Sequence, residues 1–155
     1  MMTRALLVIG VVALGGAVAA AEPLRIASFE ADITPPLGSP LCDGLVPPAR
    51  VIDDPLRARG VVLLTEREPI VLCALDWVGI GNRGYDAFRE SLAKAAQTRP
   101  ERVAVHCLHQ HDAPRCDFAV EEMLNQHGLH GAGFDVPFAR DVAERFNTRF
   151  GETFR

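Results

Sequence analysis

Short apolar runs, separated by polar and proline-rich segments, predict a mixed α/β fold for this chain. Strands are expected at residues 24–29, 56–65 and 69–76 and in the run that begins at Val103. Charged residues at 66–68 separate the second and third runs, which predicts a hairpin. These two runs are almost entirely apolar, and strands of that kind are expected to be buried on both faces of a sheet.

Helical periodicity follows the third run and returns near the C-terminus. Tyr85, Phe88, Leu92 and Ala95 have the spacing of an amphipathic helix over residues 83–97. The resulting strand–helix–strand order predicts a right-handed crossover between two parallel strands. Further helices are expected at 119–126 and 136–150. Asp135 is positioned to cap the last one. The expected fold is therefore α/β: a mixed sheet with a hairpin, a strand–helix–strand crossover and C-terminal helices.

Residues 1–21 have the pattern of a secretory signal peptide. A short basic start containing Arg4 precedes an apolar run at residues 5–18, and small residues suited to cleavage precede Glu22. The run is short and rich in Gly and Ala, which favours a cleaved signal over an uncleaved membrane anchor. We therefore expect an exported protein, periplasmic or extracellular, in which residues 22–155 form the folded part.

Charge and cysteine content exclude few classes of function. Of 16 Lys+Arg and 20 Asp+Glu, the first 21 residues contain one basic residue and no acid, which leaves 15 against 20, or −5. No basic cluster is present, so nucleic acid is not an expected partner. The four cysteines allow three full disulfide connectivities. Two of them, Cys73 and Cys107, lie in apolar runs and are expected to be small buried hydrophobes, whereas Cys42 and Cys116 fall in expected loops and could pair after export.

The strongest functional signal is the end of the fourth apolar run, Val-Ala-Val-His-Cys-Leu-His-Gln-His-Asp-Ala-Pro at residues 103–114. In an extended backbone His109 and His111 point to the same side, and Asp112 can orient an imidazole or take a proton. Asp76 ends the neighbouring strand, so it is expected at the same sheet edge, where α/β proteins carry their sites. His106, within the strand, is expected to be a core histidine rather than a ligand.

Four segments together resemble the N-terminal domain of the neutral/alkaline (non-lysosomal) ceramidase family, over about residues 26–116. These are Phe-Glu-Ala-Asp-Ile-Thr-Pro-Pro-Leu-Gly at 29–38, Asp-Pro-Leu-Arg-Ala-Arg at 54–59 with the strand after it, Val71 to Ile80, and His-Gln-His-Asp-Ala-Pro at 109–114, where the family has His-Thr-His-Ser-Gly-Pro. The resemblance implies an exported zinc amidohydrolase that cleaves the amide of ceramide-like lipids. It also implies that His109 binds zinc and that His111 contacts the substrate or the oxyanion.

The chain departs from the family pattern at Gln110, Asp112 and Ala113. The family's other metal ligands, and the segment with its nucleophilic serine, lie beyond the equivalent of residue 155. We therefore expect residues 22–155 to be the N-terminal part of a longer enzyme, inactive without a C-terminal portion. Two alternatives stay open: another metal-dependent hydrolase that uses Asp76, His109, His111 and Asp112, or a non-catalytic exported binding module or remnant.

Overall fold

Four strands form the main sheet of the computed structural model, which describes residues 23–64 and 66–149. They are β1 (Arg25–Asp32), β2 (Arg57–Leu64), β3 (Ile70–Leu75) and β5 (Val103–Cys107), in the spatial order β1-β2-β3-β5. β2 is antiparallel to both β1 and β3, whereas β5 is parallel to β3. The expected hairpin is β2–β3, and the expected crossover runs from β3 through α1 (Asn82–Ala95) to β5. The predicted mixed α/β class is confirmed. The proposed signal peptide lies outside the described residues.

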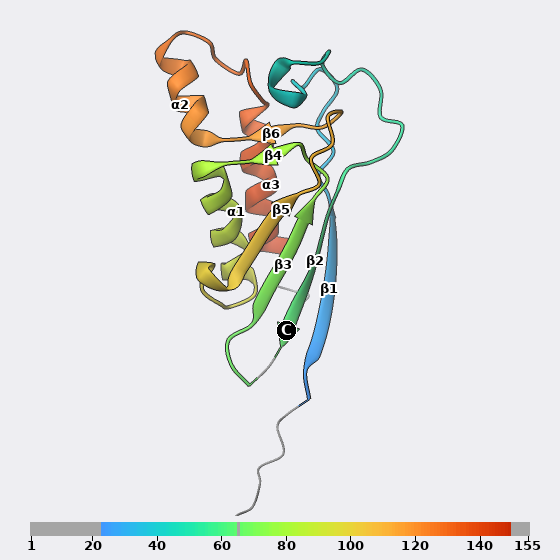
Figure 1. The fold of residues 1–155 in the computed structure, drawn as a ribbon, viewed down its shortest axis with the longest axis vertical. Coiled ribbons are helices and arrows are strands. Elements are labelled where there is room, and N and C mark those ends of the chain that lie inside the picture. Colours follow the sequence, from blue (N-terminus) through green and yellow to red (C-terminus); the bar gives the residue numbers. More distant parts are fainter. Residues whose placement is uncertain (1–22, 65, 150–155) are drawn as a thin grey trace, which may run out of the picture.

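Helices α1 and α3 (Val136–Arg149) lie on one side of the sheet (Figure 1). They bury the apolar stripe that the periodicity predicted, including Phe88 on α1 and Phe146 on α3, whose ring centres are 5.5 Å or less from their aromatic neighbours. Trp77 packs edge-on against Phe88 and is fully buried, because its indole N–H also finds an acceptor, the carbonyl of Ile33 at 3.0 Å. Asp135 caps α3 as expected: its carboxylate accepts the backbone N–H of Phe138 at 3.1 Å.

A second layer of short elements lies at the end of the sheet where β3 and β5 finish (Figure 1). β4 (Gly79–Ile80) and β6 (Arg115–Cys116) form a two-stranded parallel sheet, followed by α2 (Phe118–Gln126). Two 3-10 turns, η1 (Cys42–Gly44) and η2 (Pro100–Arg102), complete the element order. Asp117 ties this layer together, since its carboxylate accepts the backbone N–H groups of Ala119 and Val120 and the side-chain amide of Asn82.

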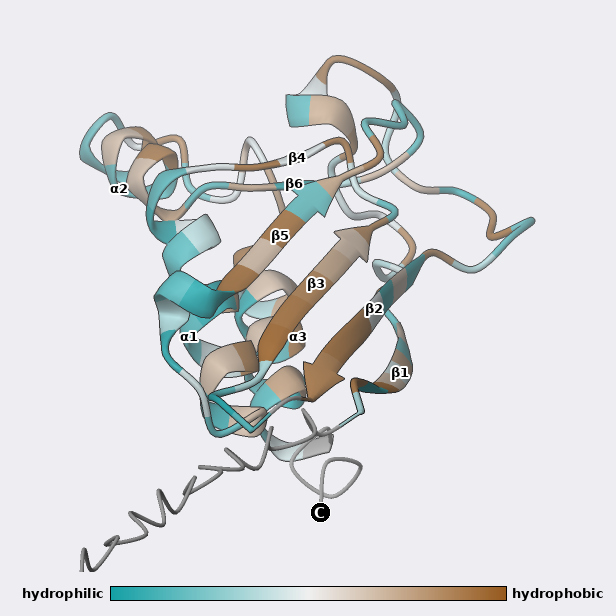
Figure 2. Ribbon diagram, turned by 60° about the horizontal axis from the view of Figure 1, so that its bottom comes forward, coloured by the Kyte–Doolittle hydropathy of each residue, from teal (hydrophilic) through white to brown (hydrophobic). Residues whose placement is uncertain are grey.

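The opposite face of the main sheet has no helix or strand in front of it among the described residues (Figure 2). Ile26 remains 63% exposed and Leu72 43% exposed on this face. The expectation that β2 and β3 are buried on both faces is therefore wrong for the described structure. Three helices follow the hairpin, and the two that reach the sheet, α1 and α3, lie on the same side of it. His106 also belongs to the open face and is exposed, which corrects its expected place in the core.

All four cysteines are free, so the structure does not contain the Cys42–Cys116 pair that the sequence left open. Burial raises the pKa of the Cys73 and Cys116 thiols to about 12 and that of Cys107 to about 11. These three side chains act as small apolar core groups. No helix among residues 23–64 and 66–149 has the length and apolar content that a membrane crossing needs.

Candidate functional site

The segment after β5 continues the parallel ladder beyond the end of the strand. Leu108 donates its backbone N–H to Leu75 O at 3.0 Å, and His109 donates to Trp77 O at the same distance. Val78 in turn donates to Pro114 O at 3.0 Å. Because Trp77 is itself fixed in the core, the loop carrying the two histidines is fastened to a rigid support at both of its ends.

His109 leaves the strand in a left-handed backbone conformation, with φ of 64°. That conformation is uncommon for a residue other than glycine and is held here by surrounding contacts. The imidazole Nδ1 lies 2.7 Å from the Val78 carbonyl oxygen. A carbonyl can only accept, so Nδ1 carries the proton and Nε2 keeps its lone pair. Metal-binding histidines commonly make the same kind of hydrogen bond, from the ring N–H that does not face the metal to a backbone carbonyl, and it fixes their tautomer.

His111 lies beside His109 as predicted, although the backbone between them is bent and not extended as the prediction assumed. The ring centres are 5.1 Å apart and the ring planes are 82° from each other. Two imidazoles on one tetrahedral zinc, each with nitrogen about 2.0–2.1 Å from the metal, have centres roughly 5 Å apart. The separation of the two ring centres is therefore compatible with a metal ion shared by both imidazoles. Both residues are exposed, so a ligand can approach them.

Gln110 and Asp112, the residues that follow His109 and His111, line a hollow of about 480 Å³ next to the histidine segment. The opposite wall is the proline-rich loop between β1 and β2, which supplies Val46 to Asp54. Gln110 also donates its side-chain amide to the Asp76 carbonyl at 3.2 Å, which fixes its direction. Sequence reasoning missed Gln110 and this loop. The position of Gln110 between the two histidines was the available signal for it.

Asp76 lies at the expected sheet edge, but its carboxylate points toward β2 rather than toward the histidines. One carboxylate oxygen accepts the backbone N–H of Arg57 at 2.8 Å and a guanidinium N–H of Arg59 at 3.3 Å. The side chain is mostly buried, and these bonds satisfy it. Asp76 therefore holds the start of β2 in register, and only its backbone carbonyl reaches the histidine segment.

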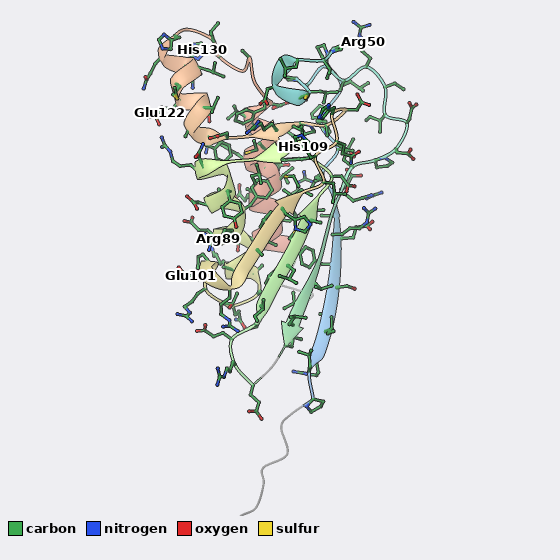
Figure 3. The ribbon with its side chains drawn as sticks, in the orientation of Figure 1. Arg50, Arg89, Glu101, His109, Glu122 and His130 are labelled. Atoms are coloured by element: carbon green, nitrogen blue, oxygen red, sulfur yellow. The ribbon has the colours of Figure 1, made fainter. Side chains whose placement is uncertain are left out.

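Another histidine, His130, lies farther along the chain, and the structure keeps it away from the pair. Figure 3 shows His109 near the end of the sheet and His130 well apart from it, beyond the end of α2. The His130 ring hydrogen-bonds to Asn125 Oδ1 at 2.7 Å. No group of three or more His, Cys, Asp or Glu side chains suited to one metal ion occurs within residues 23–64 and 66–149. These residues thus offer two imidazoles, whereas zinc sites use three or four protein ligands.

Comparison with protein-family models, with curated proteins and with solved structures finds no match for this chain.

Proposed function

We propose that this chain carries the histidine corner of an exported, zinc-dependent amide hydrolase that acts on ceramide-like lipid amides. The observation that supports the proposal best is the state of His109. Its Nδ1–H is bound by the Val78 carbonyl, and its Nε2 lone pair is exposed beside a second imidazole. This is how a strand end presents a zinc ligand. The neutral ceramidase resemblance of residues 26–116 supplies the substrate class.

In this proposal the two histidines have different roles. His109 holds the metal through Nε2, and His111 donates a hydrogen bond to the substrate or to the oxyanion that develops on the amide carbonyl. Zinc, when bound, polarises that carbonyl and activates the attacking nucleophile. The fixed backbone of the segment keeps the two rings at one separation, so neither has to be ordered during the reaction.

The hollow beside the histidines suits an amphipathic ligand. Its wall contains apolar side chains that are unusually exposed, Val51 at 68% and Ile52 at 48%, together with polar groups at Arg50, Gln110 and Asp112. Exposed apolar residues rimmed by polar ones are typical of ligand grooves. An acyl chain would lie along the loop between β1 and β2, with the amide near Gln110 and Asp112.

Two imidazoles do not complete a zinc site, so the proposal includes further ligands from polypeptide other than the described residues. Full activity is expected only when that polypeptide is present. The alternative hydrolase with a four-residue Asp/His cluster is less well supported, because the Asp76 carboxylate is engaged by Arg57 and Arg59. Asp112, which lines the hollow, is the part of that alternative that the geometry still favours.

Ligand binding in the hollow tests the proposal without requiring turnover. We would record backbone NMR spectra of the purified chain with zinc while adding a water-soluble short-chain ceramide or a phosphodiester of matched chain length. We expect the ceramide to shift the signals of Gln110, Asp112 and residues 46–54. Val51→Asp should weaken that binding roughly tenfold, because it places a charge in the apolar wall.

Val120→Asp is the matched control, because Val120 is exposed on α2 and does not line this hollow. It should bind the ceramide like the parent chain. A stronger response to the phosphodiester would favour the alternative hydrolase. No response to either ligand would overturn the proposal and leave the non-catalytic interpretation.

A further inference from the structure

The open face of the main sheet carries three rows of side chains across neighbouring strands, and a fourth, charged row of Asp32, Arg57 and Asp76 at the end where β3 finishes. The first row is Ile26, Leu63 and Ile70, the second is Ser28, Val61, Leu72 and Ala104, and the third is Glu30, Arg59, Ala74 and His106. The first two rows are almost entirely apolar. In the third, Arg59 pairs with Glu30 at 2.9 Å, so these two charges cancel.

This face differs from an ordinary solvent-facing side of an antiparallel sheet, which usually alternates to polar residues. Figure 2 shows the hydrophobic strands β2, β3 and β5 in front, with α1 and α3 behind them. Contiguous exposed apolar side chains of this kind mark an interaction surface. The face is therefore expected to be covered in the working protein.

We propose that the same face of a second copy of this chain covers it. Consider a two-fold axis that runs parallel to the strands between β2 and β3. It places β2 over β3 of the other copy and β1 over β5. Leu63 then meets Ile70, Val61 meets Leu72, and Ser28 meets Ala104. When two β-sheets pack face to face, their strands are commonly either nearly aligned or nearly perpendicular, and the proposed pair has the aligned arrangement.

Charge and size both fit this arrangement. The same axis places the Glu30 carboxylate opposite His106, so an acidic side chain meets a basic one across the pair. Four strands about 4.8 Å apart, each about six residues long at about 3.3 Å per residue, give a face of roughly 19 by 20 Å. Two such faces in contact cover roughly 760 Å² in projection, and the relief of the side chains adds to the accessible area that is buried, which brings it toward the lower end of specific interfaces. The inference does not depend on zinc or on the proposed reaction.

Sedimentation equilibrium of the purified chain and of Leu72→Glu tests the proposal. The parent should have twice the mass of a single chain. The variant should dissociate roughly a hundredfold more readily, because a two-fold interface contains each new charge twice, against apolar side chains. Leu129→Glu is the matched control: Leu129 is 52% exposed in the loop after α2 and lies off the sheet, so this variant should remain dimeric.

A cross-linking experiment tests the direction of packing. Ser28 and Ala104 lie on the two edge strands, about 14 Å apart within one sheet by the strand spacing, but opposite each other, about 10 Å apart, in the proposed pair. A short bismaleimide should link a mixture of Ser28→Cys and Ala104→Cys chains, and neither variant alone. A monomeric parent would overturn the proposal and leave the face to a different polypeptide or a lipid surface. A Leu72→Glu dimer, or cross-linking of either variant alone, would overturn it too.

Discussion

At the scale of single residues, the sequence assigned several roles that the structure bears out. Asp135 was expected to cap the last helix, and its carboxylate accepts the Phe138 backbone N–H at 3.1 Å. Cys73 was expected to be a small buried hydrophobe within its apolar run, and it is 1% exposed. Such roles are local: they depend on neighbours two to five residues away and can be inferred from the chain alone.

Other residue roles depend on contacts that no local pattern contains. Asp76 was placed at the correct sheet edge, yet the direction of its carboxylate follows from the β2–β3 register, which brings the Arg57 N–H to it. The tautomer of His109 follows from the Val78 carbonyl, which lies 31 residues earlier in the chain. Neither feature could be predicted before the strands were paired.

The environment of Asp32 predicts how the stability of the fold depends on pH. The hydrogen bonds from Thr34, aided by the positive charges of Arg57 and Arg145, lower the Asp32 pKa from the ordinary value. A carboxyl whose pKa is lower in the folded state adds stability at pH above its unfolded value of about 3.9, and that stability is lost as the pH falls through the folded value. Asp32→Asn should therefore flatten part of the loss of stability on acidification.

The measurement is the urea midpoint of unfolding at a series of pH values from about 6 downward. Asp53→Asn, in the exposed loop, controls for the loss of one negative charge. If parent and Asp32→Asn lose stability in parallel, the hydrogen bonds of Asp32 do not contribute as described.

At the scale of elements, the hairpin and the long helices were predictable because each contains several repeats of its period. α1 and α3 each carry 14 residues. β4 and β6, by contrast, have two residues each, which is too short for any period to appear. Their pairing exists because the Trp77 and Pro114 segments are brought together by β3 and β5. The one-sided covering of the sheet was also missed, since strand composition does not tell which face a helix occupies.

Gly60 provides a test of the β1–β2 pairing. It lies opposite Phe29, and a Cβ on Gly60 would overlap the Phe29 ring and lie 2.6 Å from the Leu72 carbonyl oxygen. Gly60→Ala should therefore lower the free energy of unfolding by about 1–3 kcal/mol, the usual cost of overpacking. Adding Phe29→Leu should make the combined loss smaller than the sum of the two single losses, because the two positions are in contact.

Urea unfolding of the parent, both single variants and the double variant gives the coupling free energy between positions 29 and 60. Gly133→Ala is the matched control, because a Cβ there meets only Leu124 at an ordinary 3.4 Å. Its stability should stay within about 0.5 kcal/mol of the parent. Strict additivity of Phe29→Leu and Gly60→Ala would contradict the described contact.

At the scale of the whole molecule, helices bury one face of the main sheet, and the candidate functional residues lie together at one end of that sheet. The core between the sheet and helices α1 and α3 supports the histidine segment, while the open sheet face and the hollow remain accessible. We make a separate proposal for each surface: the open sheet face binds a second copy of the chain, and the hollow binds a lipid amide. Failure of one leaves the other standing.

The zinc affinity of the purified chain tests the central claim most directly, which is that His109 is a metal ligand. We would titrate zinc in competition with a chromophoric chelator for the parent, His109→Ala and His127→Ala. His127 is exposed at the end of α2, so its replacement controls for the loss of any surface imidazole. Because the described residues supply only two imidazoles, we expect the parent and His127→Ala to bind zinc weakly, and His109→Ala to bind it at least roughly tenfold more weakly still. Equal affinity in all three chains, or no binding in the parent, would contradict the account.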